Sequence, residues 1–208
     1  MDEAVPDSES PLLEWGVATR ALEGQSESGD MAVVVPFDHG VLAAAVDGLG
    51  HGPEAARAAR VAVDLMKDCA GESVMRLAEL AHEQLKETRG AVMSLARFAT
   101  PDNTLTWLGL GNVQGRLVRH KDSQKTTFES LPLVGSIVGY RLPPLRPVTL
   151  PVEPGDLLIL ATDGVRGNFE WTGNLAARPD AVARHILDRE MTGIDDALVL
   201  VTRFLGAA

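Results

Sequence analysis

The chain contains 208 residues, a length that suits one domain or at most two small ones. Its hydrophobic fraction of 45% can build a sizeable core, which excludes a disordered or fibrous protein. With 19 Lys and Arg against 29 Asp and Glu, the formal net charge is −10, so partners that need clustered basic charge, such as nucleic acid or an anionic membrane, are not expected. The excess of carboxylates serves either solubility or the binding of a cation.

The cysteine content and the first residues indicate the compartment. Cys69 is the only cysteine, so neither an intramolecular disulfide nor a cysteine-based zinc cluster is expected. The first ten residues are acidic and lack the basic and apolar regions of a signal peptide. The sequence has no run of about 18 apolar residues that would form a transmembrane helix. We therefore expect a cytoplasmic protein under reducing conditions.

The first half of the chain predicts strands followed by a pair of helices. Residues 1–11 are polar and are expected to form a loose lead-in. Asp38-His39-Gly40 is a turn sequence between two apolar runs and predicts a β-hairpin. Pro53-Glu54 is typical of the start of a helix. The predicted elements are strands over 12–19, 31–37 and 41–46 and helices over 53–69 and 73–88.

The second half of the chain is mostly strand-like. Residues 131–147 are rich in proline and glycine and predict an irregular crossing segment. The other predicted elements are strands over 92–100, 104–109, 113–119, 148–152, 157–161 and 197–204 and a helix over 179–190. This order is typical of an α+β protein, in which helices cover antiparallel sheets. We expect a single domain over residues 1–208.

Aspartates stand at the ends of four apolar strands rather than on solvated faces. Asp30 directly precedes the run MAVVV, and Asp47 and Asp163 each end a strand and are followed by glycine. Asp195-Asp196 precedes the last predicted strand. An unpaired negative charge at the mouth of a buried strand is costly, and several such charges close together repel one another unless a cation neutralises them.

Oxygen donors without histidine or cysteine favour hard ions such as Mg²⁺ or Mn²⁺. The glycine after Asp47 and after Asp163 lets the backbone turn sharply, so that its carbonyl can approach a metal. Each Asp-Gly pair is also a turn signal in its own right, and the turn interpretation stays open. A rival interpretation makes residues 48–52 a phosphate-binding loop, but the glycine spacing does not match and Asp47 would repel the phosphate.

Taken as a set, these motifs resemble the metal-dependent PPM protein phosphatases. The matching pieces are Ser28-Gly29-Asp30, Asp47-Gly48-Leu49-Gly50-His51-Gly52, Thr162-Asp163-Gly164 and Asp195-Asp196, spread over about residues 13–204. The loop Asp-x-x-Gly-His-Gly followed by a helix is similar to the bacterial SpoIIE-type branch. Residues 109–113 and 131–135 narrow the resemblance to feedback phosphatases of that branch that act on stressosome proteins. The resemblance implies a four-layer αββα sandwich of two antiparallel sheets flanked by helices.

The resemblance also implies a metal site where the two sheets meet at one end. Asp47 would bridge two Mn²⁺ or Mg²⁺ ions, with the Gly48 carbonyl on one ion and with Asp163 and Asp195 on the other. Asp30 resembles an acidic position that supports metal-bound water or a further ion. A hydroxide that bridges two ions would attack phosphorus in line, so Asp47 and Asp163 would act in catalysis through metal-bound water.

Three further residues are secondary candidates. Asp196 is the second choice for the metal-binding member of the Asp-Asp pair. Eukaryotic members carry a histidine directly after Asp-Gly, where this chain has Leu49, and His51 could face the site instead; capping of the following helix is its alternative role. Arg20 is the candidate for the phosphate-binding arginine of the family, with a solvated surface arginine as the alternative.

The activity implied is the hydrolysis of phosphoserine and phosphothreonine on STAS-domain stress-signalling proteins of a stressosome-like complex, by a monomeric enzyme. A different class remains possible: a non-catalytic pseudo-phosphatase that docks a partner through the same surface. The intact set of aspartates favours the enzyme, because a pseudoenzyme has little reason to keep crowded charges.

Overall fold

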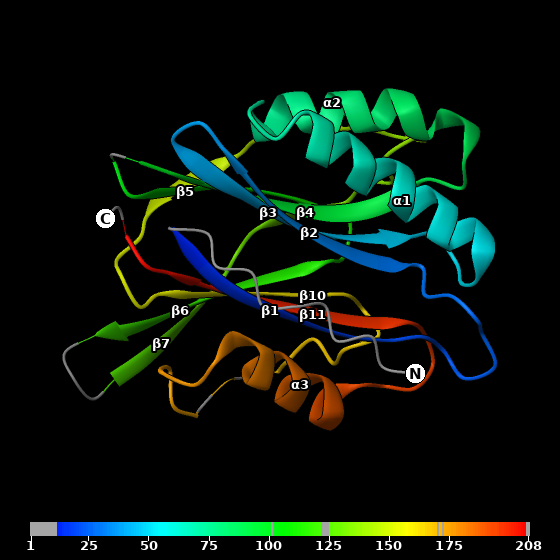
Figure 1. The fold of residues 1–208 in the computed structure, drawn as a ribbon. Coiled ribbons are helices and arrows are strands. Elements are labelled where there is room, and N and C mark those ends of the chain that lie inside the picture. Colours follow the sequence, from blue (N-terminus) through cyan, green and yellow to red (C-terminus); the bar gives the residue numbers. More distant parts are fainter. Residues whose placement is uncertain (1–11, 101, 122–124, 170, 172, 207–208) are drawn as a thin grey trace.

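The computed structural model describes residues 12–100, 102–121, 125–169, 171 and 173–206, so the proposed lead-in over 1–11 lies outside the described residues. Two β-sheets lie face to face. Helices α1 (Pro53–Asp68) and α2 (Val74–Gln84) cover one sheet, and α3 (Pro179–Glu190) covers the other (Figure 1). The expected α+β fold, a four-layer αββα sandwich, is confirmed.

In both sheets, strands that are distant in the chain lie side by side. The five-stranded sheet has the order β1-β11-β10-β6-β7, and the six-stranded sheet has the order β2-β3-β4-β5-β8 with β9 also paired to β5. All of these pairs are antiparallel except β5 with β8. The strands are β1 Leu13–Arg20, β2 Asp30–Phe37, β3 Gly40–Gly48, β4 Ala91–Ala99, β5 Thr104–Leu110, β6 Gln114–Lys121, β7 Lys125–Ser130, β8 Leu133–Val134, β9 Val148–Pro151, β10 Leu157–Ala161 and β11 Ala197–Phe204.

Strand β3 shows why the central strands are continuous apolar runs. Its side chains alternate between two cores: Leu42 and Val46 belong to the cluster beneath α1 and α2, and Val41 and Ala45 belong to the cluster between the two sheets. A strand that is buried on both faces disfavours charged side chains until it reaches its end. Asp47 is the first charged residue of β3, and it stands where the strand leaves the core.

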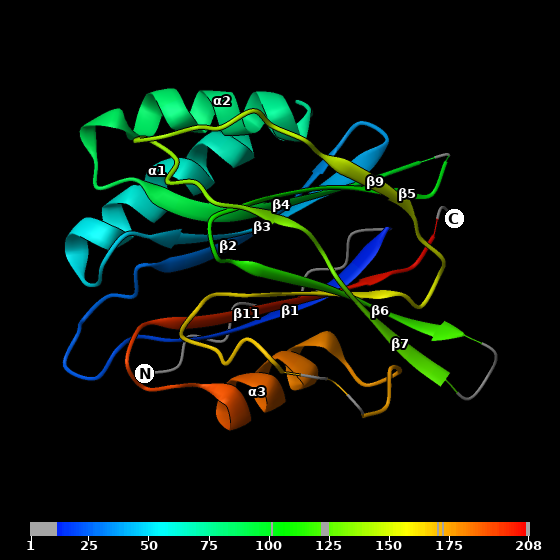
Figure 2. The ribbon, with the colours of Figure 1, turned by 180° about the vertical axis from the view of Figure 1, so that it is seen from behind.

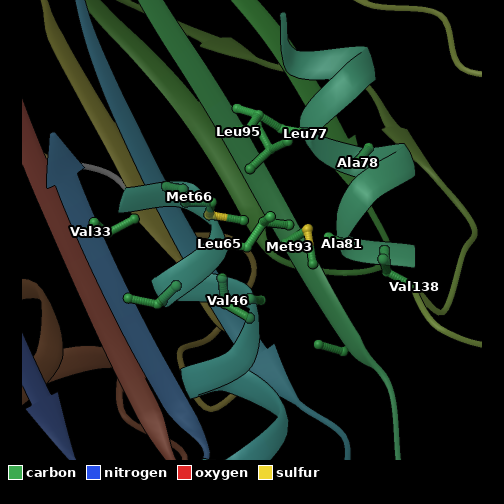
Figure 3. Close-up of a cluster of buried hydrophobic side chains, with 14 of the residues drawn as sticks. Val33, Val46, Leu65, Met66, Leu77, Ala78, Ala81, Met93, Leu95 and Val138 are labelled. Atoms are coloured by element: carbon green, nitrogen blue, oxygen red, sulfur yellow. The ribbon is translucent and has the colours of Figure 1, made fainter. Parts of the chain in front are cut away.

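The helices close the outer layers. Pro53 stands in the first turn of α1, and Ser73 caps α2 by accepting a hydrogen bond from the Arg76 amide at 3.2 Å. Figure 3 shows Leu65 of α1 and Leu77 of α2 in the cluster over the six-stranded sheet. A third cluster fills the space between α3 and the five-stranded sheet. Within the described residues, no helix is long and apolar enough to cross a membrane.

The structure departs from the sequence prediction in three places. Strand β7 was not predicted, because Phe128 is its only large apolar residue. The predicted helix over 73–88 ends at Gln84 and continues as one 3-10 turn, Leu85–Glu87. The crossing segment 131–147 contains the short strand β8 and then runs along α2 (Figure 2), where the Gly139 amide donates to His82 Nδ1 at 3.0 Å.

Candidate metal centre

Four strand ends bring the predicted aspartates to one end of the sandwich. Asp30 is the first residue of β2, and Asp47 is the last but one of β3. In the other sheet, Asp163 lies two residues after β10 and Asp195 lies two residues before β11. Because β2 pairs with β3 and β10 pairs with β11 in antiparallel fashion, the start of one strand lies beside the end of the other. Each sheet therefore contributes two carboxylates to the same region.

Three of these carboxylates line one cavity of about 370 Å³: Asp47, Asp163 and Asp195. The other residues that line it are uncharged, namely Leu49, Gly50, Val92, Gly111, Asn112, Gly135, Ser136 and Ile137. The cavity is therefore acidic, and its walls come from both sheets and from the crossing segment.

Asp30 lies outside the lining of this cavity and is tied to the opposite sheet. Its side chain is buried, with 5% of the residue exposed. Thr162 Oγ1 donates a hydrogen bond to Asp30 Oδ2 at 2.6 Å and accepts one from the Leu198 amide at 2.8 Å. Because Asp30 belongs to the six-stranded sheet and Leu198 to the five-stranded sheet, this one hydroxyl links the two sheets beside the carboxylates.

The surroundings disfavour the ionised form of these carboxylates. Burial, together with the smaller effect of the negative charges of Asp30, Asp163 and Asp195, raises the pKa of Asp47 to about 8. Burial also raises the pKa of Asp30 to about 7, although a threonine hydroxyl bonds to it. The pKa of Asp163 is raised by burial and by Asp195, against the amide hydrogen bond from Asn112 at 2.7 Å. A bound cation would stabilise the ionised forms.

The glycines that follow two of the aspartates are required by close backbone contacts. A Cβ on Gly48 would lie 2.0 Å from the carbonyl oxygen of Ala55 in α1, and a Cβ on Gly164 would lie 1.9 Å from the carbonyl oxygen of Asp196. Neither position can hold a side chain unless the backbone moves. The cavity lining includes Asp47 and Leu49 but not Gly48, so the Gly48 carbonyl as a metal ligand stays a prediction.

The two adjacent aspartates before β11 have different surroundings. Asp195 lines the cavity, and its Oδ1 accepts a hydrogen bond from the Asp196 amide at 2.8 Å. The Asp196 carboxylate is buried and accepts hydrogen bonds from the Leu22 and Gly29 amides at 2.7 and 2.6 Å. Both oxygens of Asp196 therefore hold the segment before β2, which favours Asp195 as the ligand of the pair.

Arg20 and His51 do not line the acidic cavity. Arg20, at the end of β1, pairs with Asp188 of α3 at 2.8 Å, on the side of the sheet that the helix covers. His51 is exposed in the loop before α1. The N-cap of α1 is Gly52, with no capping hydrogen bond from a side chain, so the alternative role of His51 as a helix cap is wrong.

Sequence reasoning did not single out Asn112, which lines the cavity and donates to Asp163. It lies between β5 and β6, and the glycine-rich stretch 109–113 was the available signal. An amide donor on one carboxylate oxygen fixes the orientation of that carboxylate and leaves its second oxygen available.

Arg89 is a second residue that sequence reasoning missed. The Leu49 amide donates to the carbonyl of Gly90 at 3.1 Å, which places Arg89 beside the loop that follows Asp47. Its Nη1 lies 3.0 Å from the position that a Cβ on Gly50 would occupy, and Gly50 lines the cavity. The exposed Arg89 guanidinium therefore stands at the rim of the acidic cavity.

The donors fit a hydrated hard cation. Among the described residues, no group of three or more His, Cys, Asp or Glu side chains forms a ready-made ligand cluster. Mg²⁺ does not need one, since it usually keeps several waters and binds through one or two carboxylates, and carboxylate and water also suit Mn²⁺. Asp47, Asp163 and Asp195 supply such carboxylates around one cavity, whose lining includes no histidine or cysteine. The residues present therefore fit Mg²⁺ or Mn²⁺.

The fold and this site agree with the comparison with known proteins. The family described as Stage II sporulation protein E (SpoIIE) matches residues 38–205. The chain belongs to the SpoIIE family and is a metal-dependent serine/threonine phosphatase of the PPM type. Among its relatives is the phosphoserine phosphatase RsbX of Bacillus subtilis (strain 168), which is 30% identical over 143 residues, or 69% of this chain and 70% of RsbX.

Solved structures show the same architecture. A chain from the bacterial stressosome, described as a modular system adapted to control secondary messenger signaling, is 29% identical with a TM-score of 0.82, covering 92% of this chain and 99% of that one. The crystal structure of RsbX in complex with magnesium has a TM-score of 0.80 at 24% identity, covering 96% of this chain and 98% of that one. The resemblance expected from the motifs is confirmed at the level of family and fold.

Proposed function

We propose that this chain uses Mg²⁺ or Mn²⁺ to hydrolyse phosphoserine and phosphothreonine on STAS-domain stress-signalling proteins of a stressosome-like complex. The observation that carries the proposal is the cavity in which Asp47, Asp163 and Asp195 converge from two sheets. The name of RsbX, a phosphoserine phosphatase, and the similarity to a stressosome chain support this class of substrate. We propose that the enzyme acts as a monomer.

Each carboxylate has a distinct part in the proposed site. Asp47, Asp163 and Asp195 hold the cation, with the Gly48 carbonyl as a further ligand. When bound, Mg²⁺ or Mn²⁺ supplies a Lewis acid that lowers the pKa of coordinated water and polarises the phosphoryl oxygens. Asp30 stands beside Asp47 and is held by the hydroxyl that links the two sheets, so it fixes the spacing of the carboxylates from the two sides.

Arg89 is the residue that we propose to bind the phosphoryl group, in place of Arg20. The described part of the chain offers Arg89 no carboxylate partner, whereas Arg20 is paired with Asp188. A guanidinium at the rim of a cavity that holds cations can bind phosphate oxygens through two parallel hydrogen bonds. The positive φ of Gly50, 89°, and its lack of a side chain leave room for this guanidinium.

The proposal is tested by phosphate release from phosphorylated STAS-domain proteins, with Mn²⁺ or Mg²⁺ and with EDTA. Hydrolysis is expected only with the divalent ion, and Asp47→Asn should abolish it because the variant loses a ligand charge. Asp64→Asn is the matched control, since Asp64 is exposed on α1 and, within the described part of the chain, pairs only with the nearby Lys67. Full turnover in EDTA, or by Asp47→Asn, would contradict the mechanism. Binding of the phosphoprotein without any hydrolysis would favour the pseudo-phosphatase.

A further inference from the structure

A second cavity adjoins the acidic one and carries the opposite charge. Its volume is about 390 Å³, and it shares Gly111 and Asn112 with the cavity of the aspartates. Arg116 is the only charged residue among those that line it. The charged residues that line the first cavity are all carboxylates. The two cavities, which differ in the sign of their charge, therefore lie on either side of the turn between β5 and β6.

The second cavity lies where β6 loses its neighbour. Arg116 pairs with Ser130, the last residue of β7, and one further hydrogen bond follows, from the Leu131 amide to the Gly115 carbonyl at 2.9 Å. Among the described residues, Gln114 at the start of β6 has no partner strand on that side. The chain then turns away through Leu131 and Leu133, which form part of the wall, and Leu133 is 39% exposed. The continuation of this segment, 135–137, lines the acidic cavity. One stretch of chain thus borders both cavities.

Arg116 is held in place but its charge is not neutralised. Its guanidinium carbon lies 4.7 Å from the centre of the Phe169 ring, and its Nη2 donates to the carbonyl of Gly167. Its buried Nε has no hydrogen-bond partner among the described residues, and no described carboxylate forms an ion pair with it. A fixed guanidinium without a counter-charge binds an anionic oxygen group with little loss of side-chain freedom.

We propose that this second cavity binds an acidic side chain of the phosphoprotein substrate, and that Arg116 sets this preference. The inference rests on the proposed phosphatase function, because the substrate segment is placed by its phosphorylated residue in the first cavity. Arg116 pairs with Ile159, which precedes Asp163 by four residues. Because β10 ends at Ala161, this span is somewhat shorter than the roughly 13 Å that four fully extended residues cover at about 3.3 Å per residue. The acidic residue therefore lies about three or four positions from the phosphorylated one.

Two phosphoserine peptides of equal length test the proposal. One carries Asp at the third and fourth positions on both sides of the phosphoserine, and the other carries Asn there. With saturating Mn²⁺, the wild-type chain should have a kcat/KM about 3- to 10-fold higher for the Asp peptide, the range expected for one partly exposed charged contact. Raised salt should reduce this ratio, because the attraction is electrostatic.

Two variants test whether the preference for the Asp peptide arises from the second cavity. Arg116→Gln should bring the ratio of the two kcat/KM values close to one, and the ratio is independent of any general loss of activity. If Arg116→Gln fails to fold, Ser130→Asp places an opposing charge in the same cavity at an exposed position and should also abolish the preference, with Ser130→Asn as its matched control.

The outcomes separate this inference from the proposed function. Equal hydrolysis of both peptides by the wild-type chain, or an unchanged ratio in Arg116→Gln and Ser130→Asp, would overturn the inference alone. Hydrolysis of neither peptide, nor of a phosphorylated STAS-domain protein, would overturn the proposed function on which it rests.

Discussion

Asp30 and Asp47 stand directly opposite one another on the antiparallel strands β2 and β3. Residues paired in this way project from the same face of the sheet, and like charges so placed are destabilising. Here burial adds to the repulsion and raises the pKa values of Asp30 and Asp47 to about 7 and about 8. The fold therefore places an unfavourable interaction at the position where a bound cation would relieve it, and such conflicts are typical of functional sites.

The first prediction concerns the pH dependence of the metal-free protein. An aspartate in the unfolded chain has a pKa of about 3.9, so between that value and the raised values of Asp30 and Asp47 the folded state binds more protons than the unfolded state. The free energy of unfolding contributed by this pair must then fall as the pH rises from about 4 to about 8. In EDTA, the thermal midpoint of the wild type relative to that of Asp47→Asn should be lower at pH 8 than at pH 5. A difference between the two proteins that is the same at both pH values would contradict this.

The second prediction concerns metal binding. Asp47→Asn should unfold at a higher temperature than the wild type in EDTA at pH 8, because it removes a buried charge, and should lose most of the rise in midpoint that Mn²⁺ causes in the wild type. For the wild type, this rise should grow with pH between about 6 and about 8, since the ligands bind metal in their deprotonated form. Asp64→Asn should behave as the wild type does in both conditions. Differential scanning fluorimetry with and without Mn²⁺ measures all three proteins.

The third prediction concerns the hydroxyl between the sheets. Thr162→Val should lower the free energy of unfolding by about 1–3 kcal/mol, because it leaves Asp30 and the Leu198 amide without their partner. Thr202→Val is the matched control: Thr202 is equally buried, but its hydroxyl has no hydrogen-bond partner among the described residues. That variant should be neutral or slightly stabilising. Urea unfolding in EDTA compares the two, and equal losses would contradict the assigned role of Thr162.

The fourth prediction concerns the glycine after Asp47. Gly48→Ala should destabilise the protein by about 1–3 kcal/mol or more, because its Cβ would meet the Ala55 carbonyl at 2.0 Å. Gly71→Ala should change stability by less than about 1 kcal/mol, since a Cβ there has nothing within 4 Å. Urea unfolding measures both. If the two variants were equally stable, the contact between β3 and α1 would not be the reason for the glycine.

The fifth prediction concerns Arg89. Arg89→Ala should lower kcat/KM for p-nitrophenyl phosphate by about tenfold or more, the effect of losing hydrogen bonds to a charged group, while the Mn²⁺ concentration for half-maximal activity changes little. Arg89→Lys should recover part of the loss through its charge. Arg76→Ala, on the surface of α2, is the control. A proportional change in the Mn²⁺ requirement would assign Arg89 to metal binding instead of phosphate binding.

Most of the strands and helices could be predicted from local sequence patterns. The central strands are mostly apolar on both faces, so they stand out as apolar runs, and Pro53 marks the start of α1. Strand β7 escaped prediction because its polar residues acquire a strand conformation only by pairing with β6. The predicted end of the second helix was also wrong, because the chain after Gln84 forms a 3-10 turn that no residue type in this segment predicts.

The candidate aspartates were visible in the sequence for a local reason, because a carboxylate at the end of an apolar strand is conspicuous wherever it occurs. The sequence could not show which way each aspartate side chain points or which residues surround it. Asp195 and Asp196 differ by one position, and only the fold shows that the first lines the cavity and the second binds backbone amides. Arg89 and Arg116 carry no local signal at all. The place of Arg89 at the rim of the acidic cavity and that of Arg116 in the adjoining cavity depend on strand pairings between distant parts of the chain, which the tertiary structure alone establishes.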